Sequence, residues 1–276
     1  MNNPLDFSGK VVIVTGGGRG VGLGITTRFL EANADVLICG RSELENLPEA
    51  GGRKAEFIAA DVRDVEQIAN VMSCAKQRFG RLDVLVNNAG GAPEAAAATA
   101  SPRFSEAIIR LNLIAPLNFA QQANAVMQEQ DAGGVIINIA SVSATRPSPG
   151  TAAYGAAKAG LLSLTQSLAV EWAPKVRVTG VVAGMIRTEL AHLHYGDEAG
   201  IAAVGATVPL ERMGEPKDVG DTCLYLASPL ASYVSGTSVW VHGGGEKPVF
   251  LGAAQPAQPD KSNEPAENTS DEDNSK

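Results

Sequence analysis

Tyr154 and Lys158 are the residues whose types and spacing most directly suggest chemistry. They lie four positions apart in a segment predicted to be helical, so their side chains share one helix face, one turn apart. A free tyrosine has a pKa of about 10, and a neighbouring ammonium group lowers that pKa because it stabilises the phenolate. The pair could therefore act as a general acid and base, although such pairs also occur on ordinary solvent-exposed helices.

Ser141 gives this pair a context. It ends a predicted strand and precedes Tyr154 by thirteen residues. Ligands of parallel sheets bind at the carboxyl ends of the strands, so we expect Ser141 to lie on the ligand-binding side. Its hydroxyl could hold a carbonyl oxygen there, beside the tyrosine.

A glycine-rich segment, residues 15–22, directly follows the first predicted strand. Gly16, Gly20 and Gly22 have the spacing GxxxGxG. Glycines let the backbone approach a pyrophosphate, and the dipole and free N–H groups of the next helix favour its negative charge. The segment predicts a dinucleotide-phosphate site, and a purely structural turn is the alternative.

The end of the second predicted strand indicates which dinucleotide is bound. An NAD site usually has an acid there for the ribose 2′-hydroxyl, but this chain has Arg41 directly after Gly40 and no carboxylate before Glu43. Arg41 and Arg19 offer two guanidinium groups where a 2′-phosphate would lie. The sequence therefore favours NADP(H) over NAD(H), with a solvated surface arginine as the alternative interpretation of Arg41.

Short, continuous apolar runs alternate with helical segments along the chain. The predicted strands cover residues 11–14, 36–39, 57–60, 84–86, 135–139, 176–182 and 239–241, and the long predicted helices cover 20–33, 64–79, 102–129 and 151–172. Continuously apolar strands are buried on both faces, and helical connections between them produce a parallel sheet. We expect an α/β fold, with a single doubly wound (Rossmann) domain over residues 7–252. Its seven-stranded parallel sheet would be flanked by helices on both faces.

Charge and composition argue against several classes of partner and site. The net charge of −8 disfavours nucleic acid and membrane surfaces. Half of that charge comes from residues 255–276, so residues 253–276 are predicted to be an acidic, proline-containing disordered tail. Three widely spaced cysteines indicate free thiols, and His192 and His194 are spaced for different helix faces, so no metal site is expected. Without a long apolar run or an N-terminal signal, we expect a cytoplasmic protein.

Several motifs, taken together and in this order, resemble those of the short-chain dehydrogenase/reductase family. The resemblance covers about Phe7 to Gly244 and rests on Thr15-Gly16-xxx-Gly20-x-Gly22, Asp61-Val62, Asn87-Asn88-Ala89-Gly90, Asn112, Ser141 and Tyr154-xxx-Lys158. It implies an NAD(P)(H)-dependent oxidoreductase that acts on a ketone or secondary alcohol. Three positions depart from the family pattern: Ala183 stands where the family usually has proline, His242 where it usually has aspartate, and Thr179 where it often has asparagine.

The resemblance also implies roles for the matching residues. Tyr154 would be the general acid or base, Lys158 would hold the nicotinamide ribose and lower the tyrosine pKa, and Ser141 would polarise the substrate carbonyl. Asn112 would hold a water that links Lys158 to solvent. The implied cofactor-binding residues are Gly16, Arg19, Gly20, Val21, Gly22, Arg41, Asp61, Val62, Asn88, Ala89, Gly90, Tyr154, Lys158, Gly184, Ile186 and Thr188.

The last expectations concern substrate and assembly. Residues 189–209, where the family has its substrate lid, are largely apolar, which favours an apolar small-molecule carbonyl or alcohol. Those apolar side chains could equally serve only to pack the lid on the body. The resemblance implies a homodimer or homotetramer, paired through the helices that carry Asn112 and Tyr154. A rival hypothesis is a non-catalytic dinucleotide-binding sensor or scaffold, which would not need the complete catalytic set.

Overall fold

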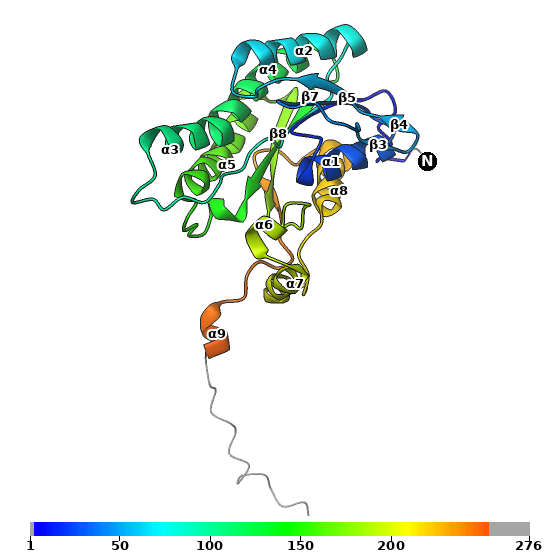
Figure 1. Ribbon diagram of the computed structural model, residues 1–276. Coiled ribbons are helices and arrows are strands. Elements are labelled where there is room, and N and C mark those ends of the chain that lie inside the picture. Colours follow the sequence, from blue (N-terminus) through cyan, green and yellow to red (C-terminus); the bar gives the residue numbers. More distant parts are fainter. Residues whose placement is uncertain (1–2, 254–276) are drawn as a thin grey trace, which may run out of the picture.

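Seven parallel strands form the main sheet of the structure, a computed structural model that describes residues 3–253 (Figure 1). Their order across the sheet is β5-β2-β1-β6-β7-β8-β9. They are β1 (Val11–Thr15), β2 (Asp35–Gly40), β5 (Glu56–Ala59), β6 (Val84–Asn87), β7 (Gly134–Ser141), β8 (Val176–Ala183) and β9 (Ser238–Val241). The predicted seven-stranded parallel sheet is confirmed, and each strand overlaps one of the predicted apolar runs.

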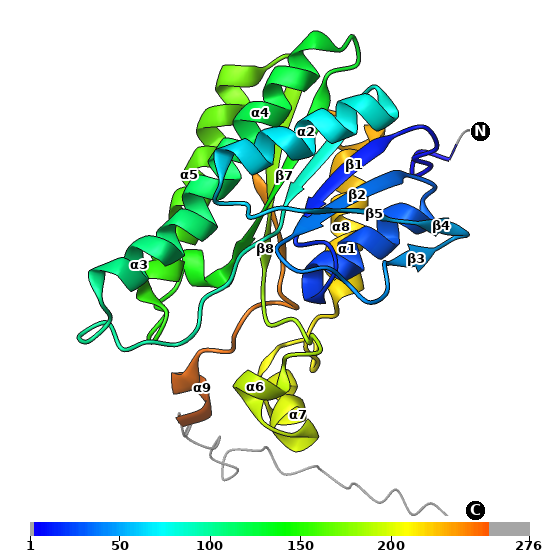
Figure 2. The same cartoon turned by 45° about the horizontal axis from the view of Figure 1, so that its top comes forward.

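Helices cover both faces of this sheet, as Figure 2 shows. They are α1 (Gly20–Glu31), α2 (Val65–Phe79), α4 (Ala115–Glu129), α5 (Ala152–Trp172) and α8 (Pro216–Ala227). Side chains alternate along β1: Ile13 packs with Phe119 in the core under α2, α4 and α5, while Val12 and Val14 pack with Phe29 in the core under α1 and α8. Both faces of the strand are therefore buried, which is why its sequence is continuously apolar.

The long helix predicted over residues 102–129 is confirmed in its bounds, but it contains a π-helical turn that the prediction did not include. It consists of α3 (Pro102–Ile109), a π-helical segment (Arg110–Ile114) and α4. Asn112 lies in the π-helical segment, where its Nδ2 donates to the carbonyl oxygen of Ile108 at 2.9 Å. Such bulges are frequent at functional sites, but the 3.6-residue apolar period does not reveal them.

The α2 helix begins and ends where its flanking residues predict. Asp64 is the N-cap, and its carboxylate accepts from the backbone N–H groups of Glu66 and Gln67. Gly80 ends the helix in the left-handed region, with φ of 75°. Both helix ends could be predicted from the sequence, because capping depends on the residues at the ends themselves.

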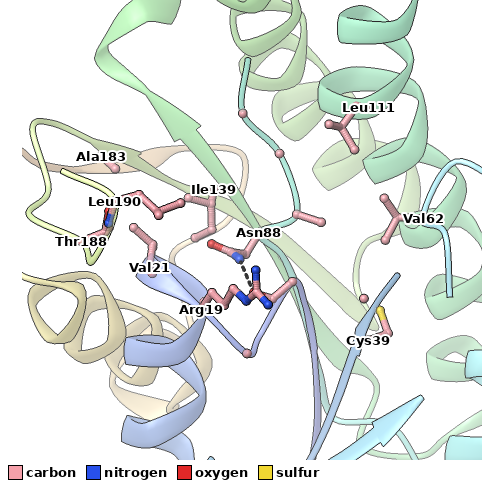
Figure 3. A pocket seen from close by; sticks show the side chains of 18 of the residues that line it. Arg19, Val21, Cys39, Val62, Asn88, Leu111, Ile139, Ala183, Thr188 and Leu190 are labelled. Atoms are coloured by element: carbon pink, nitrogen blue, oxygen red, sulfur yellow. Dashed lines mark hydrogen bonds between the residues drawn. The ribbon is translucent and has the colours of Figure 1, made fainter. Parts of the chain in front are cut away.

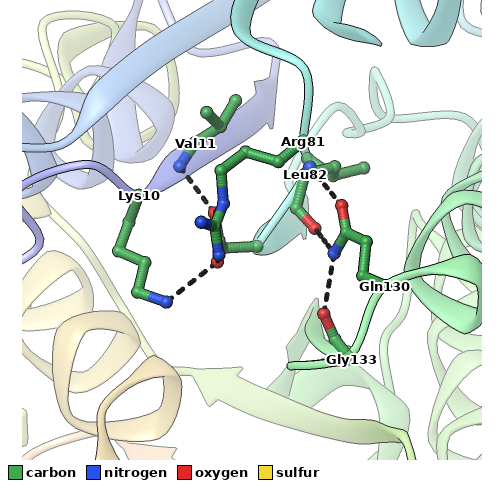
Figure 4. Close-up of polar contacts among 7 residues, drawn as sticks. Lys10, Val11, Arg81, Leu82, Gln130 and Gly133 are labelled. Carbon is green, nitrogen blue, oxygen red and sulfur yellow. Dashed lines mark hydrogen bonds and ion pairs between the residues drawn. The ribbon is translucent and has the colours of Figure 1, made fainter.

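Asp83 holds the amino-terminal edge of the sheet together through three residues that Figure 4 labels, Lys10, Val11 and Arg81. Its buried carboxylate accepts from the backbone N–H of Val11 at 3.0 Å, from Lys10 Nζ at 3.0 Å and from Arg81 Nε at 2.7 Å. A buried carboxylate with this many donors is compensated for its loss of water. The contacts tie the start of β1 to the start of β6, so both strands end at the same opposite edge.

Several smaller elements lie outside the predicted set. A short hairpin, β3 (Glu49–Ala50) and β4 (Arg53–Lys54), precedes β5, and α9 (Val249–Ala253) follows the last strand. Between β8 and α8, the helices α6 (His192–Tyr195) and α7 (Glu198–Thr207) project beyond the carboxyl edge of the sheet (Figure 1). From here on, the lid denotes residues 185–213, which include the predicted lid segment 189–209.

The limits of the described chain bear on two expectations. Within residues 3–253, no helix is long and apolar enough to cross a membrane. The predicted acidic tail over 253–276 lies outside the described residues except for Ala253, so it stays a prediction.

Candidate active site

One cavity of about 730 Å³ opens at the carboxyl ends of the strands. It is lined by all of the sequence-predicted site residues except Asn112: Gly16, Arg19, Gly20, Val21, Gly22, Arg41, Asp61, Val62, Asn88, Ala89, Gly90, Ser141, Tyr154, Lys158, Gly184, Ile186 and Thr188. Figure 3 shows Arg19, Val21, Asn88, Thr188 and Leu190 arranged around this cavity. Segments far apart in the sequence therefore meet in one place because their strands all end at the same edge.

Ser141 and Tyr154 form the polar centre of the cavity. Ser141 is the last residue of β7, and its hydroxyl accepts from the backbone N–H of Ser143 at 3.2 Å. It also lies near enough to the hydroxyl of Tyr154, in the first turn of α5, to act on the pKa of that tyrosine. Two hydroxyls from different elements are thus held side by side and can meet a single oxygen atom of a ligand.

Lys158 follows one turn later on α5 and is almost completely buried. Its Nζ donates to the carbonyl oxygen of Ile139 at 2.7 Å and lies 5.6 Å from the centre of the Tyr154 ring. Burial lowers the pKa of Lys158 to about 8, because the charged form loses its water. The ammonium group is close enough to interact with the tyrosine, but it does not touch the ring.

Burial also acts on Tyr154, in the direction opposite to the sequence expectation. Loss of water raises the pKa of the Tyr154 hydroxyl above its usual value, and the nearby Ser141 hydroxyl offsets only part of this increase. The neighbouring ammonium group alone would lower the tyrosine pKa, whereas burial raises it. In the protein alone, burial is the larger effect.

Asn112 lies behind the cavity wall rather than in it. Its side chain is fully buried, with Oδ1 accepting from the Gly91 N–H at 2.9 Å and Nδ2 donating to the Gly91 carbonyl oxygen at 3.0 Å. A Cβ on Gly90 would come within 2.6 Å of Asn112 Oδ1 and 3.3 Å of Lys158 Nζ. Asn112 therefore holds the loop after β6 against α5, and Gly90 is required because nothing larger fits between them.

The glycine loop has the shape that a pyrophosphate requires. A Cβ on Gly22 would lie 2.1 Å from the Gly16 carbonyl oxygen, so only glycine permits this close approach. Asn88 Nδ2 donates to the carbonyl oxygens of Thr15, at 2.9 Å, and Gly16, at 3.3 Å, and so fixes the loop. The first turn of α1 contains no acidic residue. These features fit the phosphates of a dinucleotide.

Three guanidinium groups surround the end of the cavity next to β2. Arg19 and Arg41 are exposed there, and Arg63, which the sequence analysis did not single out, also lines the cavity. Asp61 pairs with Arg63 at 2.5 Å, and these hydrogen bonds lower the pKa of Asp61 to about 2, with a smaller contribution from the charge of Arg41. The one carboxylate at this end is therefore committed to Arg63, and Arg41 is available to a ligand.

Two of the positions that depart from the family pattern, Ala183 at the end of β8 and His242 directly after β9, lie next to each other, and Ala183 lines the cavity. Gly184, after Ala183, packs against His242, since a Cβ on Gly184 would approach the His242 Cβ to 2.7 Å. The His242 ring lies 5.2 Å from that of Trp240, centre to centre, outside the cavity lining. His242 therefore has a packing contact rather than a contact with the cavity.

A family profile described as "Enoyl-(Acyl carrier protein) reductase" matches residues 16–246, which span the glycine loop, the tyrosine–lysine pair and the lid. The chain belongs to the short-chain dehydrogenase/reductase family. Membership of this family supports an oxidoreductase and implies a nicotinamide dinucleotide cofactor.

Named relatives and solved structures extend this likeness over most of the chain. A 3alpha-hydroxysteroid dehydrogenase of Mediterraneibacter gnavus is 36% identical over 242 residues, which cover 85% of this chain and 96% of that protein. A 3-oxoacyl-[acyl-carrier-protein] reductase of Thermotoga maritima is 35% identical over 245 residues, covering 86% and 98%. The ligand-free structure of an aldohexose dehydrogenase from Thermoplasma acidophilum has a TM-score of 0.79 at 30% identity, covering 92% and 97%. Similar folds in this family thus serve chemically different substrates.

Proposed function

We propose that this oxidoreductase interconverts a ketone and a secondary alcohol with NADP(H), and that Tyr154 is its general acid and base. The observation that carries the proposal is that Ser141 and Tyr154 line the same cavity as the glycine loop. The position of these two hydroxyl groups supports a reaction at one oxygen atom of a ligand. A protein that only bound a dinucleotide would not need these two hydroxyls beside it.

The bound nicotinamide would supply or accept the hydride. The protein itself must then donate or accept the proton. Tyr154 donates its hydroxyl proton to the substrate oxygen during reduction, and the tyrosinate accepts it back during oxidation. Ser141 donates a hydrogen bond to the same oxygen and polarises the carbonyl. Proton transfer of this kind contributes about 10²–10⁴-fold to the rate.

Lys158 would support this transfer electrostatically. Its ammonium group, fixed by the Ile139 carbonyl oxygen, favours the tyrosinate over the neutral phenol. Its donor groups face the cavity, where they would hold the ribose hydroxyls of the cofactor. Asn112 would act indirectly, because it holds the loop that carries Gly90 against Lys158.

The preference for NADP(H) rests on Arg41, with Arg19 and Arg63 nearby. Gly40 and Arg41 both line the cavity, and the lining carboxylate Asp61 is engaged by Arg63. A ribose 2′-phosphate would meet positive charge there, whereas a free 2′-hydroxyl would find no acceptor at the end of β2.

The proposed substrate is an apolar carbonyl compound or alcohol. Leu190 lines the cavity and is 48% exposed, and Leu193 and Leu210 in the lid are 67% and 66% exposed. An exposed leucine in the cavity lining, with further exposed leucines on the lid, favours an apolar ligand. The relatives named for hydroxysteroids and for oxoacyl groups support the same class.

Assembly and location remain parts of this proposal. Ile114, at the π-helical segment, and Val170, on α5, are 40% and 81% exposed. Apolar side chains on these neighbouring helices support pairing into a homodimer or homotetramer. We also propose that the protein works in the cytoplasm, in agreement with its three free cysteines.

The direct test is NADPH oxidation against a ketone panel that includes 3-oxosteroids, 3-oxoacyl thioesters and an aldose. Turnover is expected with one of the apolar ketones and NADPH. Failure with every ketone, together with tight NADPH binding, would favour the non-catalytic sensor over the proposed enzyme.

A further inference from the structure

The lid contacts the glycine loop through one carboxylate. Glu189 follows the β8 strand, and both of its carboxylate oxygens accept from the backbone N–H of Gly20, at 3.1 and 3.2 Å. The two residues are 169 positions apart in the sequence. The adjoining Thr188 also lies against the loop, because a Cβ on Gly20 would meet its methyl carbon at 3.4 Å.

This contact caps a helix that has no cap of its own. The N-cap residue of α1, Arg19, makes no side-chain capping bond, and the first turn of α1 contains no acid. The first N–H groups of a helix lack partners within the helix, and the positive end of its dipole attracts an anion. Glu189 supplies that anion from the lid.

A dinucleotide pyrophosphate would require the same place. The free N–H groups at the start of α1 form the phosphate cradle, and Gly20 is one of them. Glu189 lines the same cavity as Arg19, Val21 and Thr188, which Figure 3 shows around it. A carboxylate and a pyrophosphate are both negative, so they cannot share one N–H donor.

We propose that Glu189 is a latch that holds the lid on the cofactor-free α1 N-terminus, and that the cofactor's pyrophosphate displaces it. The proposal rests on the dinucleotide site and is independent of the role of Tyr154. Displacement frees Glu189 from the Gly20 N–H, while Ile186 and Thr188 of the lid remain in the lining of the cofactor cavity. The cost is a lower cofactor affinity than the cradle could give without Glu189.

The test is the Glu189→Gln variant, titrated with NADPH and with adenosine 2′-monophosphate. The second ligand has the adenosine and the 2′-phosphate but no pyrophosphate. Loss of a helix cap corresponds to about three- to thirtyfold in an equilibrium constant, so NADPH should bind about three- to thirtyfold more tightly. The affinity for adenosine 2′-monophosphate should stay unchanged.

Glu198→Gln is the matched control. It removes one negative charge from the same lid, where Glu198 pairs with Arg187 and makes no contact with the glycine loop. Its NADPH affinity should remain that of the parent protein. Hydrogen exchange gives an independent measurement: the Gly20 amide should be protected in the cofactor-free parent and less protected in Glu189→Gln.

Any of the following results would contradict the proposal that Glu189 is a latch. Unchanged or weaker NADPH binding in Glu189→Gln would show that the carboxylate does not compete with the pyrophosphate. Equal tightening for both ligands, or for both variants, would indicate a general effect of charge. An unprotected Gly20 amide in the parent protein would show that the contact is not maintained in solution. None of these readouts depends on turnover, so they leave the proposed reaction to its own test.

Discussion

Replacing Arg41 with alanine should weaken NADPH binding by tenfold or more and leave NADH binding nearly unchanged. Arg41 is exposed at the end of β2 and lines the cavity, so its guanidinium group is free to meet a 2′-phosphate. A hydrogen bond to a charged group contributes about 1.5–3 kcal/mol, which corresponds to about ten- to a hundredfold in affinity. Because Arg41 is solvent-accessible and Arg63 remains beside it, we expect the lower part of this range.

The reverse change at the neighbouring residue should favour NADH. A Cβ on Gly40 would meet only the Phe57 ring, at 3.9 Å, so Gly40→Asp fits without moving the backbone. The new carboxylate would accept from a free 2′-hydroxyl and repel a 2′-phosphate.

The assay is a fluorescence titration of NADPH and NADH on the parent, Arg41→Ala and Gly40→Asp proteins. Arg103→Ala is the control, because Arg103 is an exposed arginine of α3 that does not line the cavity. The preference for NADPH should shrink as salt is added, since exposed charges are screened over about 10 Å at 0.1 M salt. Equal binding of NADH and NADPH by the parent protein would refute the reasoning, and so would equal weakening of both cofactors in Arg41→Ala.

Three other changes test the parts that support the site. Gly22→Ala should abolish cofactor binding and lower the melting temperature, because its methyl group would lie 2.1 Å from the Gly16 carbonyl oxygen; normal NADPH titration would contradict this. Asn112→Ala should destabilise the protein by about 1–3 kcal/mol in urea unfolding, because it removes the three hydrogen bonds that the buried Asn112 side chain makes to Gly91 and Ile108. Lys158→Met should stabilise the cofactor-free protein below about pH 8, and the gain should shrink as pH rises toward 10.5. The reason is that the Lys158 pKa falls from 10.5 in the unfolded chain to about 8 in the folded one, so the unfolded chain binds more protons in that interval. Urea unfolding at several pH values measures this gain, and a gain that is independent of pH would count against the lowered pKa.

The strands and the outline of the site were predictable because their signals are local. Continuously apolar runs marked all seven strands, and Asp64 and Gly80 marked the ends of α2. Once parallel strands were inferred, the carboxyl edge followed, and with it the meeting of the glycine loop, Ser141 and Tyr154.

The remaining features depend on contacts that a local pattern does not encode. Asn112 bonds across to the loop at Gly91, and this pairing with the π-helical segment is invisible in the apolar period. The contact between Gly20 and Glu189 joins residues that no spacing rule connects. Arg63 could have been found, because it stands two residues after Asp61 on a turn, where a salt bridge is sterically easy.

Turnover by Tyr154→Phe tests the central claim most directly. The phenyl ring fills the same space next to Ser141 and carries no proton, so NADPH affinity should remain nearly that of the parent protein. With whichever ketone the parent reduces, turnover should fall to about one per cent or less, in line with the 10²–10⁴-fold contribution of proton transfer. Turnover well above this level, with cofactor binding intact, would show that Tyr154 is not the proton donor and that the proposed mechanism is wrong.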